Sequence, residues 1–169
     1  MKRILIILAL ILQTISTAFS QQTEESFFVH NGRNIFYLMM PVSEVYEMLG
    51  NPDKVQIIKN TVPFHDYNTV ILEYSGIVFT YIDLFDNPKV LMISFEDNYQ
   101  LKNMNVIGRG RDGILEECGA PVSMKIQNGD IIFIYEFLLS HIEHIVLELR
   151  FNASGICVGA VLIHSNILI

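Results

Sequence analysis

A short pattern that occurs twice, at positions 46 and 115, constrains the fold more than any other feature of this sequence. The first copy is YEMLGNPDKV (46–55) and the second is LEECGAPVSM (115–124). Glycine suits the left-handed position that ends a helix, and a proline two residues later keeps the helix from resuming. Each copy therefore predicts a short helix whose end turns the chain into a strand.

The residues around each copy extend this prediction. Apolar residues at three- and four-residue spacing before Gly50 indicate a helix of about two turns, which is too short to be stable alone in water. Segments rich in β-branched and aromatic residues, separated by turn residues, follow both helices and predict strands. The predicted strands are 54–60, 69–74, 76–83 and 89–95 after the first helix, and 122–128, 130–137, 144–151 and 155–164 after the second.

The order of elements predicts an α+β fold made of two tandem repeats, each a short helix followed by a four-stranded antiparallel sheet. We expect the repeats to share one continuous curved sheet with the helices on one face. The expected divisions are a signal peptide (1–20), an N-terminal lead-in (21–37), a first repeat (38–97) and a second repeat (98–169). The lead-in could form a hairpin that turns at Asn31-Gly32, or an extended segment.

The first twenty residues have the layout of a secretory signal peptide. Lys2 and Arg3 precede an apolar run, 4–12, and small residues lead up to a cleavage site between Ser20 and Gln21. The run is shorter than the roughly 20 apolar residues that cross a membrane. The sequence therefore predicts an exported protein, periplasmic or secreted, with no transmembrane span in the mature chain.

The charge balance bears on the kind of partner. The chain has 11 basic and 18 acidic residues, a formal charge of −7, and removal of Lys2 and Arg3 leaves 9 against 18, or −9. Nucleic-acid binding depends on Lys and Arg that neutralise phosphates, so this balance disfavours it.

Alternation along the predicted strands indicates a sheet with one free face. In 144–151, four apolar residues alternate with Val146, Glu148 and Arg150. In an antiparallel sheet covered on one side by helices, the second set faces solvent. This open face is partly apolar, and such a patch either binds a partner or is covered by the lead-in.

The connection 61–68 is the longest predicted hairpin loop, and its aromatic side chains are of the kind that dominates protein interfaces. Alternatively, Phe64 or Tyr67 folds back on the sheet. The sequence thus predicts a non-enzymatic protein-binding module without cofactor, which uses the open sheet face and this loop to bind an unidentified envelope or extracellular protein. The predicted partner-binding residues are Phe64, His65, Asp66, Tyr67, Glu73, Thr80, Ile134, Glu136, Val146, Glu148 and Arg150.

The two helix regions also resemble a known family. The residues concerned are Met40, Val45, Tyr46, Gly50 and Pro52 in the first copy, and Gly110, Ile114, Leu115, Gly119 and Pro121 in the second. This unit resembles the module of the β-lactamase inhibitory proteins, and is similar to the small lipoprotein of the bacterial outer-membrane β-barrel assembly machine. The resemblance implies two modules whose shared sheet grips a protein partner, or alternatively a cell-envelope assembly or maintenance factor.

Catalytic chemistry has little support in the sequence. His141, Glu143 and His144 could take part in weak metal binding if Asp130, Glu136 or His164 lay near, or they could form a solvated loop. Cys118 and Cys157 lie in apolar segments that disfavour a reactive thiolate, and they could be bridged or remain two small buried thiols. No G-x-S-x-G motif is present.

Overall fold

The computed structural model describes residues 27–62, 65–84, 86–102, 104–138 and 144–164. The predicted signal peptide, Phe64, His141 and Glu143 lie outside these residues, as does the side chain of His65.

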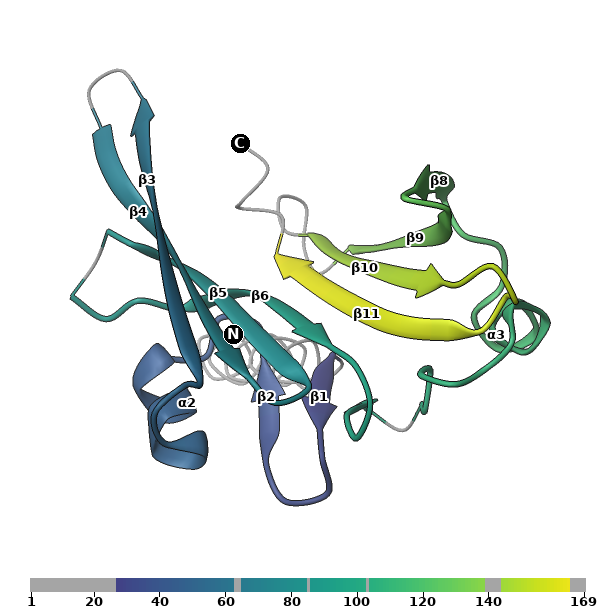
Figure 1. Cartoon of the computed structure of the whole chain (residues 1–169), viewed down its shortest axis with the longest axis horizontal. Coiled ribbons are helices and arrows are strands. Elements are labelled where there is room, and N and C mark those ends of the chain that lie inside the picture. Colours follow the sequence, from purple (N-terminus) through teal and green to yellow (C-terminus); the bar gives the residue numbers. More distant parts are fainter. Residues whose placement is uncertain (1–26, 63–64, 85, 103, 139–143, 165–169) are drawn as a thin grey trace, which may run out of the picture.

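Eight strands form one antiparallel sheet in the order β3-β4-β5-β6-β11-β10-β9-β8 (Figure 1). Their bounds are β3 (Lys54–Val62), β4 (His65–Tyr74), β5 (Ile77–Asp83), β6 (Val90–Phe95), β8 (Ser123–Gln127), β9 (Asp130–Leu138), β10 (His144–Phe151) and β11 (Cys157–His164). At the centre of the sheet β6 pairs with β11, from Phe95 opposite Ala160 to Met92 opposite Ile163. Strands β3 and β8 are the two edges.

A second sheet contains three short strands in the order β2-β1-β7. Strands β1 (Phe28–His30) and β2 (Ile35–Tyr37) form a hairpin, and Val29 of β1 lies opposite Leu101 of β7 (Gln100–Leu101). Of the two alternatives for the lead-in, the hairpin is therefore confirmed.

The two helices begin and end near the predicted residues. Helix α2 spans Val42–Leu49 and helix α3 spans Arg111–Cys118. Gly50 (φ 74°) and Gly119 (φ 77°) end them in the left-handed region, which L-residues rarely adopt. Within the described ranges, neither helix has the length and hydropathy needed to cross a membrane.

The hydrophobic core lies between one face of the large sheet and the layer formed by the helices and the small sheet. Phe79 of β5 is fully buried, and its ring centroid lies 5.1 Å from that of Phe36 in β2. Val45 of α2 and Ile114 of α3 are also fully buried. The described part of the lead-in thus packs against the core face of the large sheet.

The predicted fold class, α+β with two tandem helix-plus-sheet repeats, is wrong. Over the residues that the structure describes, the chain is mainly β, with two helices of eight residues each, one eight-stranded sheet and a separate three-stranded sheet. Backbone pairing between β6 and β11, and between β1 and β7, connects segments far apart in the sequence. Local periodicity does not show such pairings, because it reports which face a residue occupies and not which strand lies beside it.

The predicted loop at 61–68 is also wrong. Strands β3 and β4 stay paired as far as Val62 opposite His65, so this segment belongs to a hairpin of long strands. Strand β5 pairs with β4 only from Asn68 to Tyr74. The distal part of the hairpin therefore extends beyond the sheet as a two-stranded arm (Figure 1).

Candidate partner-binding groove

One row of directly opposed residues crosses all eight strands of the large sheet on the face away from the helices. Opposed residues of an antiparallel pair point to the same face, so the register places their side chains side by side. The row is Lys54, Glu73, Val78, Ser94, Val161, Glu148, Ile134 and Ser123. None of its eight members is buried. This is the open face that the strand alternation predicted.

The open face is hollowed into a groove of about 550 Å³. Residues of β4, β5, β6, β11, β10, β9 and the end of β8 line it, together with the β8–β9 turn, so it spans both sides of the central β6–β11 pair. Its charged lining consists of Glu73, Glu96, Asp130, Glu148 and Arg150, while Val78, Ile132 and Val161 provide apolar surface. The groove thus combines carboxylates, one guanidinium group and aliphatic side chains.

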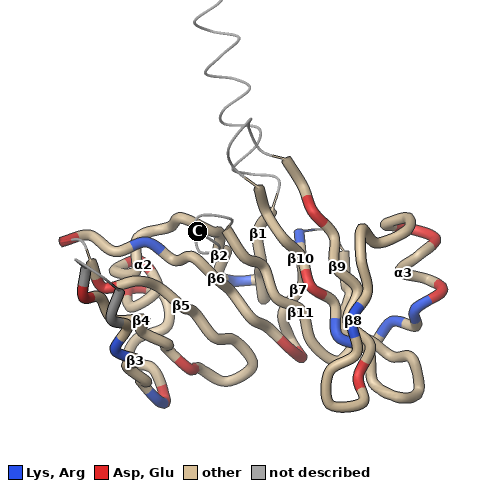
Figure 2. The backbone as a smooth tube through the Cα atoms, turned by 90° about the horizontal axis from the view of Figure 1, so that it is seen from above, with Lys and Arg blue, Asp and Glu red and all other residues tan. Residues whose placement is uncertain are grey.

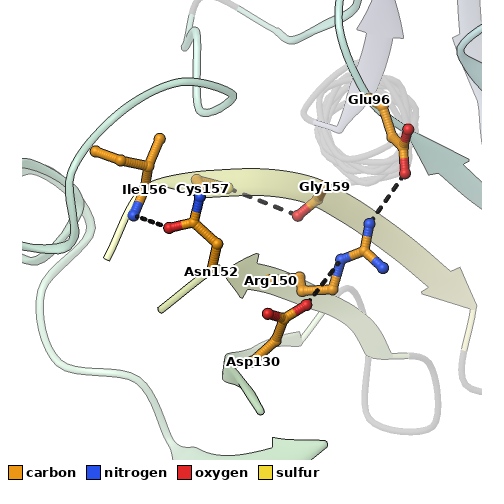
Figure 3. Close-up of polar contacts among 7 residues, drawn as sticks. All are labelled: Glu96, Asp130, Arg150, Asn152, Ile156, Cys157 and Gly159. Atoms are coloured by element: carbon orange, nitrogen blue, oxygen red, sulfur yellow. Dashed lines mark hydrogen bonds and ion pairs between the residues drawn. The ribbon is translucent and has the colours of Figure 1, made fainter. Parts of the chain in front are cut away.

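Arg150 lies in the middle of this charged lining. Its Nη2 donates a hydrogen bond to Oε1 of Glu96 at 3.0 Å, and its Nε lies 3.9 Å from Oδ2 of Asp130 (Figure 3). Glu96 follows β6, so the guanidinium group reaches it across β11. Gly159 of β11 lies directly opposite Arg150, and a Cβ there would come within 3.1 Å of Nη2. The missing side chain at Gly159 leaves the space that the guanidinium group occupies.

The other two groove carboxylates also have cationic neighbours. Lys54 contacts Glu73 at 3.0 Å, and Lys125 contacts Glu148 at 2.7 Å. The pKa of Glu73 is lowered, mainly by a hydrogen bond from Gln56 and to a smaller extent by one from Lys54. Acidic and basic positions are distributed over both halves of the chain (Figure 2). The groove is therefore a polar surface with paired charges, and such exposed pairs add little to stability.

The structure brings three of the predicted partner-binding residues together in the groove, namely Glu73, Glu148 and Arg150. Ile134 belongs to the same row and is half-buried, and Glu136 is exposed farther along β9. Val146 and Thr80 share this face but are only 9% and 7% exposed. They contribute little to the accessible surface.

Of the remaining predicted residues, His65, Asp66 and Tyr67 lie in the part of β4 that belongs to the arm, and Phe64 is outside the described residues. The alternation of β4 places Tyr67 on the face of Glu73 and places exposed Asp66 on the opposite face. Glu73 lies six positions after Tyr67 along β4, which corresponds to roughly 20 Å. The arm and the groove are therefore separate surfaces.

Sequence reasoning missed Glu96, Asp130, Gly159 and Val161 as lining residues. Glu96 follows the last residue of β6 and Asp130 is the first residue of β9, so neither stood out in the alternation of a strand. Gly159 could have been found, because an isolated glycine inside a strand commonly marks a close approach by another group.

The described part of the chain contains no disulfide and no cluster of side chains that could bind a metal ion. Both cysteines are free, and Cys118 donates to Sδ of Met104 at 3.5 Å. Burial raises the pKa of Cys157 to about 11, which keeps this thiol protonated at neutral pH. The described residues contain no group of three or more His, Cys, Asp or Glu side chains that could hold a metal ion. The predicted His141–His144 pair falls partly outside them.

The fold and the groove define a mainly β protein with an open, mixed polar and apolar sheet face. No family model matches the chain, and no curated protein and no solved structure matches it.

Proposed function

We propose that this chain is a non-catalytic protein-binding module that holds a segment of another protein in the groove of the large sheet. The observation that carries the proposal is the groove of about 550 Å³ on the open face, lined by residues of seven neighbouring strands and centred on charged side chains. An open sheet face with aliphatic, carboxylate and guanidinium groups offers a partner both apolar contact and fixed polar contacts.

The charges of the groove favour a partner with basic and apolar side chains. Four carboxylates line it against the single cation Arg150, and Lys54 and Lys125 at its margins leave a small acidic excess. Glu96 is 61% exposed on its side chain, so its carboxylate is available to a second cation. Electrostatic complementarity of this kind increases the association rate and weakens with salt. With a cleaved signal peptide at 1–20, the partner would be a protein of the periplasm or the extracellular medium.

A capture experiment with a matched charge-reversal control tests this function. Three baits are compared: the purified chain, its Arg150→Glu variant and its Arg33→Glu variant. Arg33→Glu is the control, because Arg33 is exposed on the β1–β2 turn, outside the groove. We expect one partner from envelope extract to be retained by the parent chain and Arg33→Glu and lost with Arg150→Glu. Titration of that purified partner should then show weaker binding as salt rises.

Two results would overturn the proposal. In the first, all three baits retain the same proteins, which would show that the groove is not the binding surface. In the second, Arg33→Glu loses the partner as fully as Arg150→Glu, which would indicate dependence on overall charge. Far-ultraviolet circular dichroism of each bait establishes that the variants remain folded.

A further inference from the structure

The edge strand β8 and the residue before it expose three apolar side chains that are among the most accessible of the described chain. Val122, Met124 and Ile126 are 64%, 67% and 79% exposed. Met124 lies opposite Phe133 of β9, which in turn lies opposite fully buried Leu149 of β10. These three apolar residues thus continue the core face of the sheet past β9, where they remain exposed.

The same strand lacks the protection that edge strands usually have. Natural sheets commonly guard an edge with lysine, because an unpaired row of N–H and C=O groups is a template for another strand. The only lysine of β8 is Lys125, on the open face, and its Nζ donates to Oε1 of Glu148 at 2.7 Å. Glu148 belongs to β10, two strands in from the edge. Lys125 therefore leans inward over the sheet and leaves the outer edge of β8 accessible.

We propose that β8 pairs antiparallel with β8 of a second copy of this chain, about a two-fold axis perpendicular to the sheet. A two-fold axis in this direction keeps the core face of both copies on the same side of the joined sheet. Core-face residues must therefore lie opposite core-face residues, which excludes registers that differ by a one-residue slip. One register places Met124 opposite Met124 of the second copy, with Val122 opposite Ile126 and Ser123 opposite Lys125. The alternative register, one pair farther along, places Lys125 opposite Lys125, and like charges opposed across strands are destabilising.

Charge and hydrophobic pattern thus select the same arrangement. In the Met124-centred register, six apolar side chains gather on the core face, and the two lysines stay opposite serine on the open face. The sheet becomes continuous across both copies, and both grooves face the same side. A partner that presents two binding segments would then gain avidity, commonly 10²- to 10⁴-fold over a single site. The pairing itself does not depend on the proposed function of the groove.

Sedimentation equilibrium of the purified chain tests the pairing. We expect a monomer–dimer equilibrium in which Met124→Lys raises the dissociation constant at least tenfold. The matched control is Ile57→Lys on the other edge strand, β3, where Ile57 is 66% exposed on the same face as Met124. This control should dimerise as the parent chain does. A parent chain that stays monomeric at millimolar concentration, or dimerisation lost in Ile57→Lys and kept in Met124→Lys, would overturn the proposal.

Two variants, each with one added cysteine, test which residues of the two β8 strands lie opposite each other. Met124→Cys should give a covalent dimer with a short thiol cross-linker, since the two residues oppose each other. Ile126→Cys should give far less, because its own copies would be about 13 Å apart, four residues along the strand. The parent chain, with Cys118 and Cys157, measures the background. Equal or greater cross-linking of Ile126→Cys would exclude the Met124-centred register.

Discussion

Tyr74 ties strand β4 to the end of helix α2, because its hydroxyl donates a hydrogen bond to the carbonyl oxygen of Gly50 at 3.1 Å. Tyr135 of β9 makes the same contact with Gly119 after α3, at 3.2 Å. In each case a strand residue holds the glycine that ends the helix. Two short helices that would be marginal alone are thereby fixed to the sheet.

Removal of either hydroxyl should weaken this attachment. We expect Tyr74→Phe and Tyr135→Phe each to lower the free energy of unfolding by about 1 kcal/mol, the net value of a typical hydrogen bond. Urea denaturation measures the change. The matched control is Tyr81→Phe, since the Tyr81 hydroxyl makes no hydrogen bond with the described residues. If all three variants unfold at the same urea concentration, the contacts do not support the helices.

Phe36 connects the small sheet to the large one, and its neighbour Ile35 provides a control on the same strand. Phe36 is fully buried against Phe79, whereas Ile35 is 54% exposed. Truncation of a buried phenylalanine costs about 3–5 kcal/mol, so Phe36→Ala should show a loss of that order in urea denaturation. Ile35→Ala should change the unfolding free energy by less than about 0.5 kcal/mol. Similar losses in the two variants would contradict the packing of β2 on the core face.

Thr80 should be more stable as valine. The side chain is 7% exposed, and its Oγ1 has no hydrogen-bond partner among the described residues. A buried unsatisfied hydroxyl costs about 1–3 kcal/mol, so Thr80→Val should raise the free energy of unfolding by about 1 kcal/mol. Thr69→Val should act in the opposite direction, because Thr69 Oγ1 accepts a hydrogen bond from Asn60 Nδ2 at 2.7 Å. Thermal unfolding of the two variants should show an increase in stability for Thr80→Val and a decrease for Thr69→Val. Destabilisation by Thr80→Val would show that the Thr80 hydroxyl has a hydrogen-bond partner.

Arg150→Ala should leave stability almost unchanged while it removes the central cation of the groove. The side chain is 46% exposed, and exposed ion pairs such as Arg150–Glu96 contribute about 1 kcal/mol or less. Chemical denaturation of Arg150→Ala should therefore agree with the parent chain within about 1 kcal/mol. A much larger loss would assign Arg150 a mainly structural role and would weaken the capture experiment.

Stability at alkaline pH should depend on Cys157. Burial raises the pKa of this thiol from 9.0 to about 11, so the folded chain keeps a proton that the unfolded chain releases. The stabilisation is fully present below pH 9 and is lost as pH rises from 9 towards 11. We expect the urea midpoint to fall between pH 8.5 and 10, and to fall less in Cys157→Ala. This range largely precedes the loss linked to Tyr74, whose pKa is raised from 10.0 to about 12 by burial. If the urea midpoint falls equally with pH in the parent chain and in Cys157→Ala, Cys157 is not a buried, protonated thiol.

Much of the local structure was predictable from the sequence. Gly50 and Gly119 end helices at the predicted positions, since glycine tolerates the left-handed conformation. The strand at 144–151 was predicted to the residue, and its alternation placed Leu149 in the core and Glu148 and Arg150 on the open face. These features depend on neighbours within a few residues, so periodicity and turn residues were sufficient to predict them. The signal peptide, the partner and the non-catalytic role remain predictions.

The sequence alone thus determined where both described helices and most of the strands occur and which face of those strands is apolar, but it missed β7 and the strand residues near 61–68. Only the tertiary structure decided that β6 pairs with β11, that residues near the N-terminus form a second sheet with β7, and that Arg150 reaches Glu96 across Gly159. Strand pairing depends on backbone groups that every residue carries, so distant segments compete on packing and not on local pattern. The groove exists because that pairing places residues from both halves of the chain on one hollowed face.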